Sequence, residues 1–363
     1  MPDFDFEALS SLGLTPLMAG RAAALAVQQA AAELHLVRIT EVHRGTLTAH
    51  DGVRELSMRV LPRVVRMLAD EGTVIAAGDW AWANVDPHRA AWVTHRVPPV
   101  STIARRDGEG RAHAIVSNVD VVVLVMGLDA DFNPRRLERF LALVHDDAIV
   151  PVVVLTKADL VSSSERDERI DELRSRISSA IEIAAVDATD AAAARALAGY
   201  CTRGTTLVML GSSGAGKSTL TNTLIGEHVQ DTGAVRVNDG RGKHTTTSRS
   251  LHRLPGGACV IDTPGIRTLR PVGDATALSS SFADVESLAA HCRFADCRHG
   301  TEPGCAVRER VDGDRLRNYH KLLRELRRDT LSALERQRHL AQMKVRGRAV
   351  RVKMKLKRGD GFG

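Results

Sequence analysis

The sequence predicts a multidomain chain, with a small N-terminal β-barrel, a central α/β domain on a parallel sheet, and a C-terminal helical domain around a metal ion. Three observations predict it. Short alternating runs with frequent turn signals fill residues 36–100. Near-continuous apolar runs follow from about residue 115, and three cysteines cluster near the C-terminus. The 363 residues are enough for two or three hydrophobic cores.

The N-terminal part is expected to form an Ala-rich extension, residues 1–35, followed by the barrel. The extension should contain a helix near residues 21–34. Several short strands within about 65 residues, separated by turn signals, are typical of a small barrel. This region contains every tryptophan of the chain, and we favour packing in the barrel over stacking on nucleic-acid bases for these side chains: Trp80, Trp82 and Trp92.

The central part predicts a parallel sheet covered by helices. Residues 121–126, 149–155 and 205–210 are near-continuous apolar runs, as expected for strands buried on both faces. Between the first two, Asn133 is suited to cap a helix and Pro134 to its first turn.

A P-loop follows the third of these strands and precedes a helix-compatible stretch. Its glycines allow backbone N–H groups to surround phosphates, Lys217 is expected to reach the β- and γ-phosphates, and the Ser218 hydroxyl to bind Mg²⁺. The predicted phosphate-binding residues are Gly211, Ser212, Ser213, Gly214, Ala215, Gly216, Lys217, Ser218 and Thr219.

The base-recognition motif closes the strand at residues 149–155. A carboxylate at Asp159 can accept hydrogen bonds from N1–H and N2–H₂ of guanine, a donor pair that adenine lacks. The motif therefore predicts GTP and GDP as ligands, held by Thr156, Lys157, Ala158 and Asp159.

Two further segments complete a GTPase site. Asp262 is expected to hold Mg²⁺, and the N–H of Gly265 to touch the γ-phosphate. Thr245 or Thr246 is the expected switch threonine. Because the base motif precedes the P-loop, the usual order of motifs is circularly permuted, which is possible when the original termini lie close in space.

Ras-like GTPases carry a water-orienting glutamine soon after the glycine that corresponds to Gly265. In this chain the next residue is Ile266, which cannot orient water. His244 is the internal candidate for this catalytic role, together with Lys217, because a neutral imidazole accepts a hydrogen bond. A solvated loop histidine is the equally weighted alternative.

The clustered cysteines predict one structural Zn²⁺. Three thiolates and one imidazole form a closed tetrahedral site, for which the ligands are Cys292, Cys297, His299 and Cys305. Cys201 and Cys259 have no such neighbours and are expected in the core.

The charge distribution points to a polyanionic partner. The net charge is +6, and residues 344–358 contain eight Lys or Arg and no acid. Acidic residues precede the first apolar stretch and no apolar run is long enough to cross a bilayer, so we expect a cytoplasmic protein without a membrane partner.

Together these motifs resemble the bacterial ribosome-small-subunit-dependent GTPase A family of circularly permuted GTPases. The resemblance spans roughly residues 36–340 and rests on Asn118-Val119-Asp120, Asp131-Phe132-Asn133, TKAD, GSSGAGKST, GKHTTT, IDTPGIR and the segment from Cys292 to Cys305. It implies an OB-fold barrel at residues 36–105, a permuted GTPase domain at 106–275, a zinc-binding helical domain at 276–340 and a basic tail at 341–363. It also implies binding of the 30S subunit late in subunit maturation, and it favours His244 as catalytic. We expect the chain to contact 16S rRNA and to act as a monomer.

The chain departs from the family pattern at two places. Thr156 stands where the family usually has Asn, which is expected to weaken a contact that braces the loop. Asp187-Ala188 stands in place of a Ser-Ala dipeptide near guanine O6, where a carboxylate must turn away from the base.

Two other functions fit parts of the sequence. One is a P-loop ATPase, which the base motif disfavours. The other is an RNA-binding protein with an OB barrel, a zinc module and a catalytically inert G domain. GTP turnover with and without 30S subunits separates the latter from an enzyme.

Overall fold

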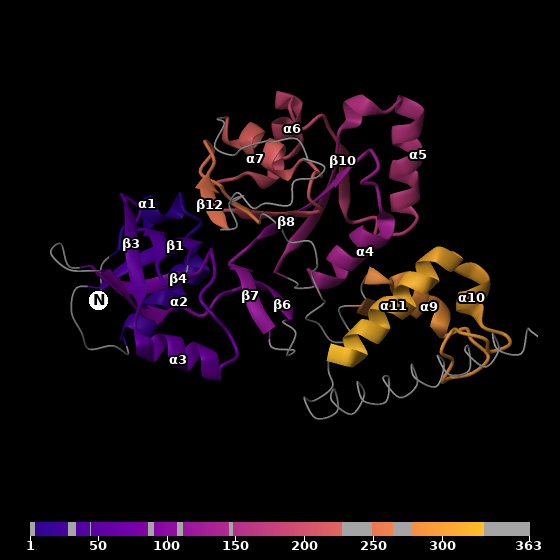
Figure 1. Ribbon diagram of the computed structural model, residues 1–363, viewed down its shortest axis with the longest axis horizontal. Helices are drawn as coiled ribbons and strands as arrows, with labels where there is room; N and C mark the ends of the chain where they lie inside the picture. The colour runs from indigo at the N-terminus through magenta and orange to yellow at the C-terminus, as the bar shows by residue number, and fades with distance from the viewer. Residues whose placement is uncertain are drawn as a thin grey trace, which may run out of the picture.

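The structure is a computed structural model that describes residues 4–27, 34–43, 45–85, 91–106, 112–144, 148–226, 249–263, 278–279 and 281–329. Figure 1 shows a barrel with its N-terminal helices at one end, a sheet flanked by helices in the middle, and a helical module at the other end. Among the described residues, no helix is both long and apolar enough to cross a membrane.

Two short helices precede the barrel: α1 (Phe6–Ser10) and α2 (Pro16–Val27). The expected helix at residues 21–34 was misplaced. The helix begins at Pro16, where the fixed φ of proline suits a first turn and the Thr15 hydroxyl accepts from the N–H of Met18. Leu34 instead starts a strand, paired with Asn84, because residues 34–36 alternate between core and surface.

Five strands close into the barrel, and one helix lies between the third and fourth strands. The elements are β1 (Leu34–Val42), β2 (Leu47–His50), β3 (Glu55–Val60), α3 (Pro62–Asp70), β4 (Trp80–Asn84) and β5 (Ala91–Arg96). Their order is β1-β2-β3-β5-β4 with β4 returning to β1, and only β3 and β5 pair in parallel. This is OB-fold topology, which confirms the predicted fold class for this part.

The tryptophans of β4 belong to the barrel core. Trp80 and Trp82 are 0% exposed, and the Trp82 indole donates to the carbonyl of Ala22 on α2 at 3.1 Å. Packing rather than base stacking is therefore confirmed for these two side chains. Trp92, on β5, is half-buried.

A two-stranded hairpin follows, β6 (Thr102–Arg106) with β7 (Ala112–Ser117), and leads into the central domain. The central elements are β8 (Val121–Gly127), α4 (Pro134–Leu143), β9 (Val150–Thr156), η1 (Ala158–Leu160), α5 (Ser163–Arg174), β10 (Glu182–Ala185), α6 (Ala191–Ala196), η2 (Ala198–Tyr200), β11 (Thr206–Gly211), α7 (Lys217–Ile225), β12 (Ser250–Arg253) and β13 (Cys259–Asp262). Asn133 caps α4 as expected, since its side chain accepts from the N–H of Arg136.

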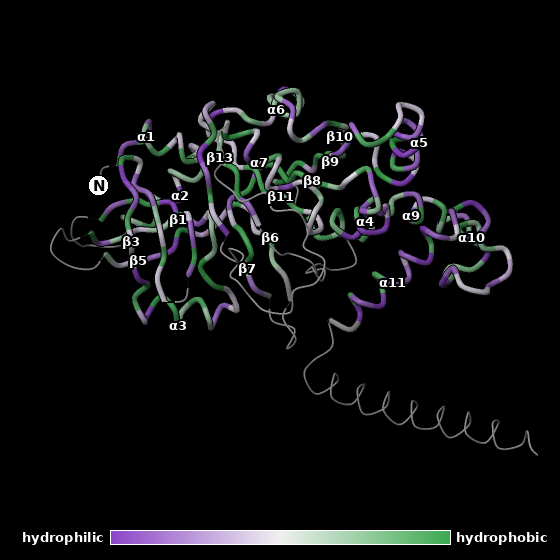
Figure 2. The backbone as a smooth tube through the Cα atoms, turned by 45° about the horizontal axis from the view of Figure 1, so that its top comes forward, coloured by the Kyte–Doolittle hydropathy of each residue, from purple (hydrophilic) through white to green (hydrophobic). Residues whose placement is uncertain are grey.

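The strands run in the order β10-β9-β8-β11-β13-β12, and all pairs are parallel except β12 with β13. α4 and α5 pack on one face, and α6 and α7 on the other. Figure 2 shows the hydrophobic colour concentrated along the central strands. The P-loop strand β11 lies in the middle, so its C-terminal end opens at the position where α/β sheets bind ligands.

The buried Arg38 of β1 joins the barrel to the central sheet. Its guanidinium donates to the carbonyls of Gly13 and Asn118 and to the Thr206 hydroxyl, and lies 5.0 Å from the Trp80 ring. Removal from water lowers the pKa of this arginine.

The C-terminal module consists of α9 (Ala283–Ala289), α10 (Ala306–Arg310) and α11 (Gly313–Asp329). It docks on α4, whose Ala142 belongs to the same hydrophobic cluster as Phe282 and Leu322. At the centre of the contact, the Glu138 carboxylate of α4 accepts from Arg315 and Asn318 of α11. Figure 1 shows the two helices side by side.

Candidate nucleotide site and metal centre

Residues 212–216 form a glycine-rich loop between Gly211, which ends β11, and Lys217, which starts α7. Gly214 and Gly216 have φ values of +81° and +87°, which favour glycine. At Gly211 a Cβ atom would lie 2.2 Å from the carbonyl oxygen of Val125, so the neighbouring strand excludes any side chain there. The loop's tight path is therefore encoded by its glycines, as a phosphate cradle requires.

Lys217 occupies the inside of this loop. Its side chain is largely buried, and Nζ donates to the carbonyls of Gly211 at 3.0 Å and Ser212 at 2.6 Å. Desolvation lowers the pKa of the ammonium, against the attraction of Asp262 and Asp131. The cation is thus fixed at the centre of the loop where phosphate charge would be placed.

Asp262 ends β13, the parallel neighbour of β11. It is 4% exposed, and among the described residues nothing donates a hydrogen bond to its buried Oδ1. A buried carboxylate oxygen without a donor is costly unless a cation reaches it. The donor set therefore fits Mg²⁺, with Ser218 at the start of α7 as the second protein ligand predicted from the sequence.

The base motif lies directly against the P-loop. The Thr156 hydroxyl donates to the carbonyl of Ala215 at 2.7 Å, so threonine at this position still braces the loop. Lys157 has a positive φ of 60°, and its Nζ pairs with Asp129 at 2.7 Å. Asp159 is exposed on η1, with its carboxylate outside the core.

The carboxylate of Asp187, which departs from the family pattern, is held by its own loop. Its Oδ1 accepts from both the N–H and the hydroxyl of Thr189, and these bonds lower the pKa of the carboxyl group. The neighbouring carbonyl of Ala188 accepts from Thr223 on α7.

Sequence reasoning assigned no role to the residues that hold the P-loop from the α4 side. Both carboxylate oxygens of Asp131 accept from the Ser212 hydroxyl, at 2.6 and 2.7 Å. Arg136 Nη2 in turn donates to the same carboxylate at 2.6 Å. The available signal was topological, because Asp131 follows β8, the strand that pairs with the P-loop strand.

Four predicted residues lie outside the described part of the chain: His244, Thr245, Thr246 and Gly265. Their roles remain predictions.

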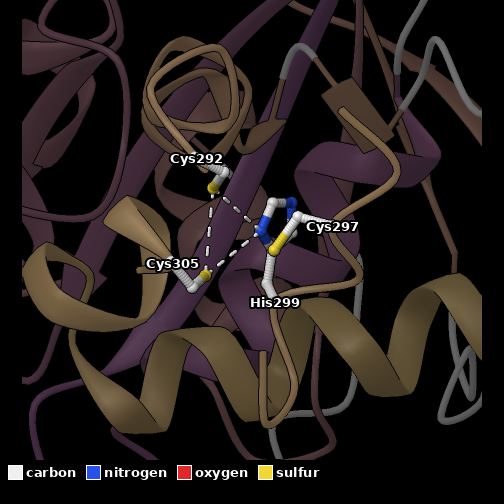
Figure 3. Close-up of side chains that lie close together, drawn as sticks. All are labelled: Cys292, Cys297, His299 and Cys305. Atoms are coloured by element: carbon white, nitrogen blue, oxygen red, sulfur yellow. Dashed lines mark hydrogen bonds between the residues drawn. The ribbon is translucent and has the colours of Figure 1, made fainter. Parts of the chain in front are cut away.

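The predicted zinc ligands come together in the C-terminal module (Figure 3). Nδ1 of His299 lies 3.6 Å from Sγ of Cys292 and 3.5 Å from Sγ of Cys305, and the two sulfurs are 3.9 Å apart. With Cys297, all four ligand atoms lie within 4.8 Å of one another. Ligands about 2.0–2.3 Å from a tetrahedral zinc ion have closely similar separations, so the residues fit this metal.

Of the two remaining cysteines, Cys259 is a core residue, as expected, whereas Cys201 is half-buried and packs against the core. Burial raises the pKa of both Cys201 and Cys259 to about 11.

Known proteins resemble the chain over most of its length. The family model for the RsgA GTPase matches residues 97–271. The small ribosomal subunit biogenesis GTPase RsgA of Xanthomonas oryzae pv. oryzae (strain MAFF 311018) is 42% identical over 327 residues, which cover 88% of each chain. The chain belongs to the RsgA GTPase family. The protein of the same name from Xanthomonas campestris pv. campestris (strain B100) is 44% identical over 293 residues, 78% of this chain and 79% of that one.

Two solved structures support the fold of this RsgA GTPase. The crystal structure of YjeQ from Thermotoga maritima matches with a TM-score of 0.58 at 23% identity, covering 81% of this chain and 98% of the other. YloQ, described as a circularly permuted GTPase, matches with a TM-score of 0.54 at 20% identity, covering 81% and 95%. The predicted family and fold class, including the permuted order, are confirmed.

Proposed function

We propose that this RsgA GTPase hydrolyses GTP while bound to the small ribosomal subunit and assists late maturation of that subunit. Its relatives of 42–44% identity are named small ribosomal subunit biogenesis GTPases and align over most of both chains. We further propose that the protein acts as a monomer in the cytoplasm and contacts 16S rRNA.

One observation carries the nucleotide part of this proposal. The hydrogen bond from Thr156 to the carbonyl of Ala215 joins the base motif to the P-loop, although the two residues are 59 positions apart. A base acceptor and a phosphate cradle held together in this way form one guanine-nucleotide site. In an ATPase the carboxylate of the base motif would have no donor pair to bind, because adenine lacks one.

The proposed division of labour follows the motifs. Lys217 and the backbone of residues 211–219 bind phosphates, and Asp159 selects guanine. Ser218, Asp262 and one of Thr245 and Thr246 hold Mg²⁺, which supplies charge neutralisation on the phosphates, and Gly265 contacts the γ-phosphate. His244 orients the attacking water, since Ile266 cannot do so.

The remaining parts are proposed to position the protein on the subunit. The proposed domain limits are 1–35, 36–105, 106–275, 276–340 and 341–363, although β1 starts at Leu34 and β6 extends to Arg106. A structural Zn²⁺ on the Cys/His cluster stabilises the C-terminal module. The basic tail binds RNA, and about five neutralised phosphates would give a salt slope of roughly −3.5 to −4.5 in a double-logarithmic plot.

The deciding experiment is GTP turnover of the full-length chain with and without purified 30S subunits. We expect slow turnover alone and strong stimulation by the subunit, with Lys217→Ala as the inactive control. Comparable site completion in trans gives roughly 10³–10⁵-fold in Ras-like systems. Turnover that is absent under both conditions would leave an inert RNA-binding G domain as the better reading.

A second measurement tests the switch. Affinity for 30S subunits is expected to be higher with a non-hydrolysable GTP analogue than with GDP, as linkage requires when the subunit favours the GTP state. His244→Ala should keep both affinities and lose most of the stimulated rate. Equal affinities in the two nucleotide states would refute the switch.

A further inference from the structure

A basic cavity of about 1160 Å³ lies between the central domain and the C-terminal module. Its walls come from the start of α4, from residues 295–300 beside the zinc ligands, and from α11. Eight arginine or lysine side chains line it, against the single carboxylate of Asp296. Figure 1 shows α4 and α11, the two helices that carry most of these cations, next to each other.

The cations of the cavity fall into two groups. Arg135 and Arg139 of α4 form ion pairs with Asp314 and Glu325, so their role is to hold α4 against α11. By contrast, Arg317 and Lys321 of α11 are exposed. Among the described residues, the one hydrogen bond of the Arg317 side chain goes to Asp314 at 3.3 Å, a carboxylate already paired with Arg135.

The spacing of the exposed cations matches an extended polyanion. Arg317, Lys321 and Arg324 recur at i, i+4 and i+7, which places them on one face of α11. Four residues of helix advance about 6 Å along the axis, a step comparable to that between successive phosphates of an RNA strand. Cations spaced along a nucleic-acid backbone in this way are typical of protein grooves that bind single-stranded RNA.

One cavity residue also reaches the nucleotide site. Arg136 lines the cavity, and its Nη2 donates to the carboxylate and the carbonyl of Asp131. The same carboxylate accepts from Ser212 of the P-loop. In the described part of the chain, Nη1 and Nε of Arg136 have no hydrogen-bond acceptor, so the guanidinium can bind an anion that enters the cavity.

We propose that this cavity binds the phosphate backbone of RNA, and that Arg136 links its occupancy to the P-loop. An RNA phosphate that draws the guanidinium towards the cavity competes with Asp131 for it, and so removes one of the two anchors of the carboxylate that holds Ser212. The cavity thereby supplies a route by which the small subunit stimulates GTP hydrolysis. This inference rests on the proposed function and names the surface through which it would act.

The binding test compares two pairs of substitutions in the full-length protein. Arg317→Gln with Lys321→Gln removes two cavity cations. Arg166→Gln with Arg174→Gln removes the same charge from solvent-accessible positions of α5. Dissociation constants for 30S subunits are measured between about 50 and 200 mM salt. Turnover without subunits should be unchanged in both variants, which shows that they fold.

For the cavity pair we expect the double-logarithmic salt slope to become shallower by about 1.4 to 1.8, the value for two phosphate contacts. The control pair should leave the slope nearly unchanged. Equal shifts in both pairs would reduce the cavity to general surface charge and overturn the proposal. Binding of a polyglutamate peptide of matched charge is measured as well. If the cavity substitutions weaken peptide binding more than RNA binding, the proposal is overturned in favour of an acidic protein partner.

A fluorescein-labelled 20-nucleotide oligouridylate separates this inference from the proposed function. Suppose that the wild type does not bind 30S subunits, and that the cavity pair binds oligouridylate more weakly than the wild type does. The cavity proposal then stands and the proposed partner is wrong. If 30S subunits bind and stimulate the wild type but neither probe distinguishes the two pairs, the cavity fails alone.

The link to the P-loop is tested with Arg136→Lys, which keeps the charge but lacks the planar fork. We expect 30S affinity to be retained and KM for GTP to change little. The ratio of stimulated to basal kcat should fall at least about tenfold, the equivalent of one hydrogen bond to a charged group, because an ammonium group cannot hold Asp131 and a cavity phosphate through one planar fork. Ser212→Ala removes the hydrogen bond between the P-loop and Asp131, and it should lower the ratio of stimulated to basal kcat in the same way. An unchanged ratio in both variants would exclude Arg136 as the link.

Discussion

Replacing Glu138 by glutamine should loosen the C-terminal module from the central domain. The Glu138 carboxylate is 1% exposed and accepts from Arg315 at 2.8 Å and from Asn318 at 2.5 Å, while Arg176 lies 3.4 Å away. An amide of the same shape brings an NH₂ group against one of these donors. It also removes the charge that compensates Arg315.

The magnitude follows from what Arg315 keeps. Breaking a buried ion pair by removing one partner typically costs about 3–5 kcal/mol. Arg315 retains both oxygens of Asp284, at 2.6 and 2.8 Å, so the low end of about 3 kcal/mol is expected. At 1.36 kcal/mol per decade, this corresponds to roughly 150-fold faster opening of α11.

Hydrogen exchange read by mass spectrometry on the zinc-loaded, full-length protein measures this opening. Peptides from α11 should exchange about 150-fold faster, while peptides from β8 and β11 keep their protection. Glu325→Gln is the matched control, because its partner Arg139 is partly exposed and the loss should stay below about 1 kcal/mol. Exchange of α11 that stays within twofold of the wild type would contradict the assigned role of Glu138.

Three further outcomes are expected. Asp159→Asn should weaken GTP binding and favour xanthosine triphosphate, because the amide donates where xanthine carries a carbonyl; competition binding that still prefers guanine would remove Asp159 from the base site. Thr156→Val should weaken GTP binding by about 1–3 kcal/mol, because the buried carbonyl of Ala215 loses its donor. Thr156→Ser keeps the hydroxyl and should preserve GTP affinity. Equal affinities of the Val and Ser variants in nucleotide titrations would show that the hydrogen bond is dispensable. One equivalent of zinc should co-purify and, because such sites supply about 10–16 kcal/mol of folding free energy, chelation should unfold the C-terminal module before the central sheet; a folded, untagged preparation without zinc in elemental analysis would refute a zinc site.

The chemistry-bearing segments could be found in the sequence because each is local. The P-loop needs glycines at fixed steps between a strand and a helix, and the structure has both: β11 precedes the loop and α7 follows it, as expected. The four metal ligands fall within 14 consecutive positions, from Cys292 to Cys305, so short loops suffice to bring them together. Asn133 signals the start of α4 through its own backbone neighbours.

The α2 position shows where local signals fail. Alanines propagate a helix but do not mark its ends, so the composition of residues 21–34 could not locate the start at Pro16 or the change to strand at Leu34. The strand is determined by pairing of Leu34 with Asn84, 50 residues later in the chain.

Tertiary structure alone decided how the site is held. Thr156 reaches Ala215 across 59 residues, Ser212 reaches Asp131 across 81, and Arg315 reaches Glu138 across 177. A sequence pattern specifies which groups can donate and accept, but not which of them the sheet order brings within hydrogen-bonding distance. The motifs therefore determined the chemistry of this RsgA GTPase, and the placement of β8 beside β11 and of α11 against α4 determined which side chains brace it.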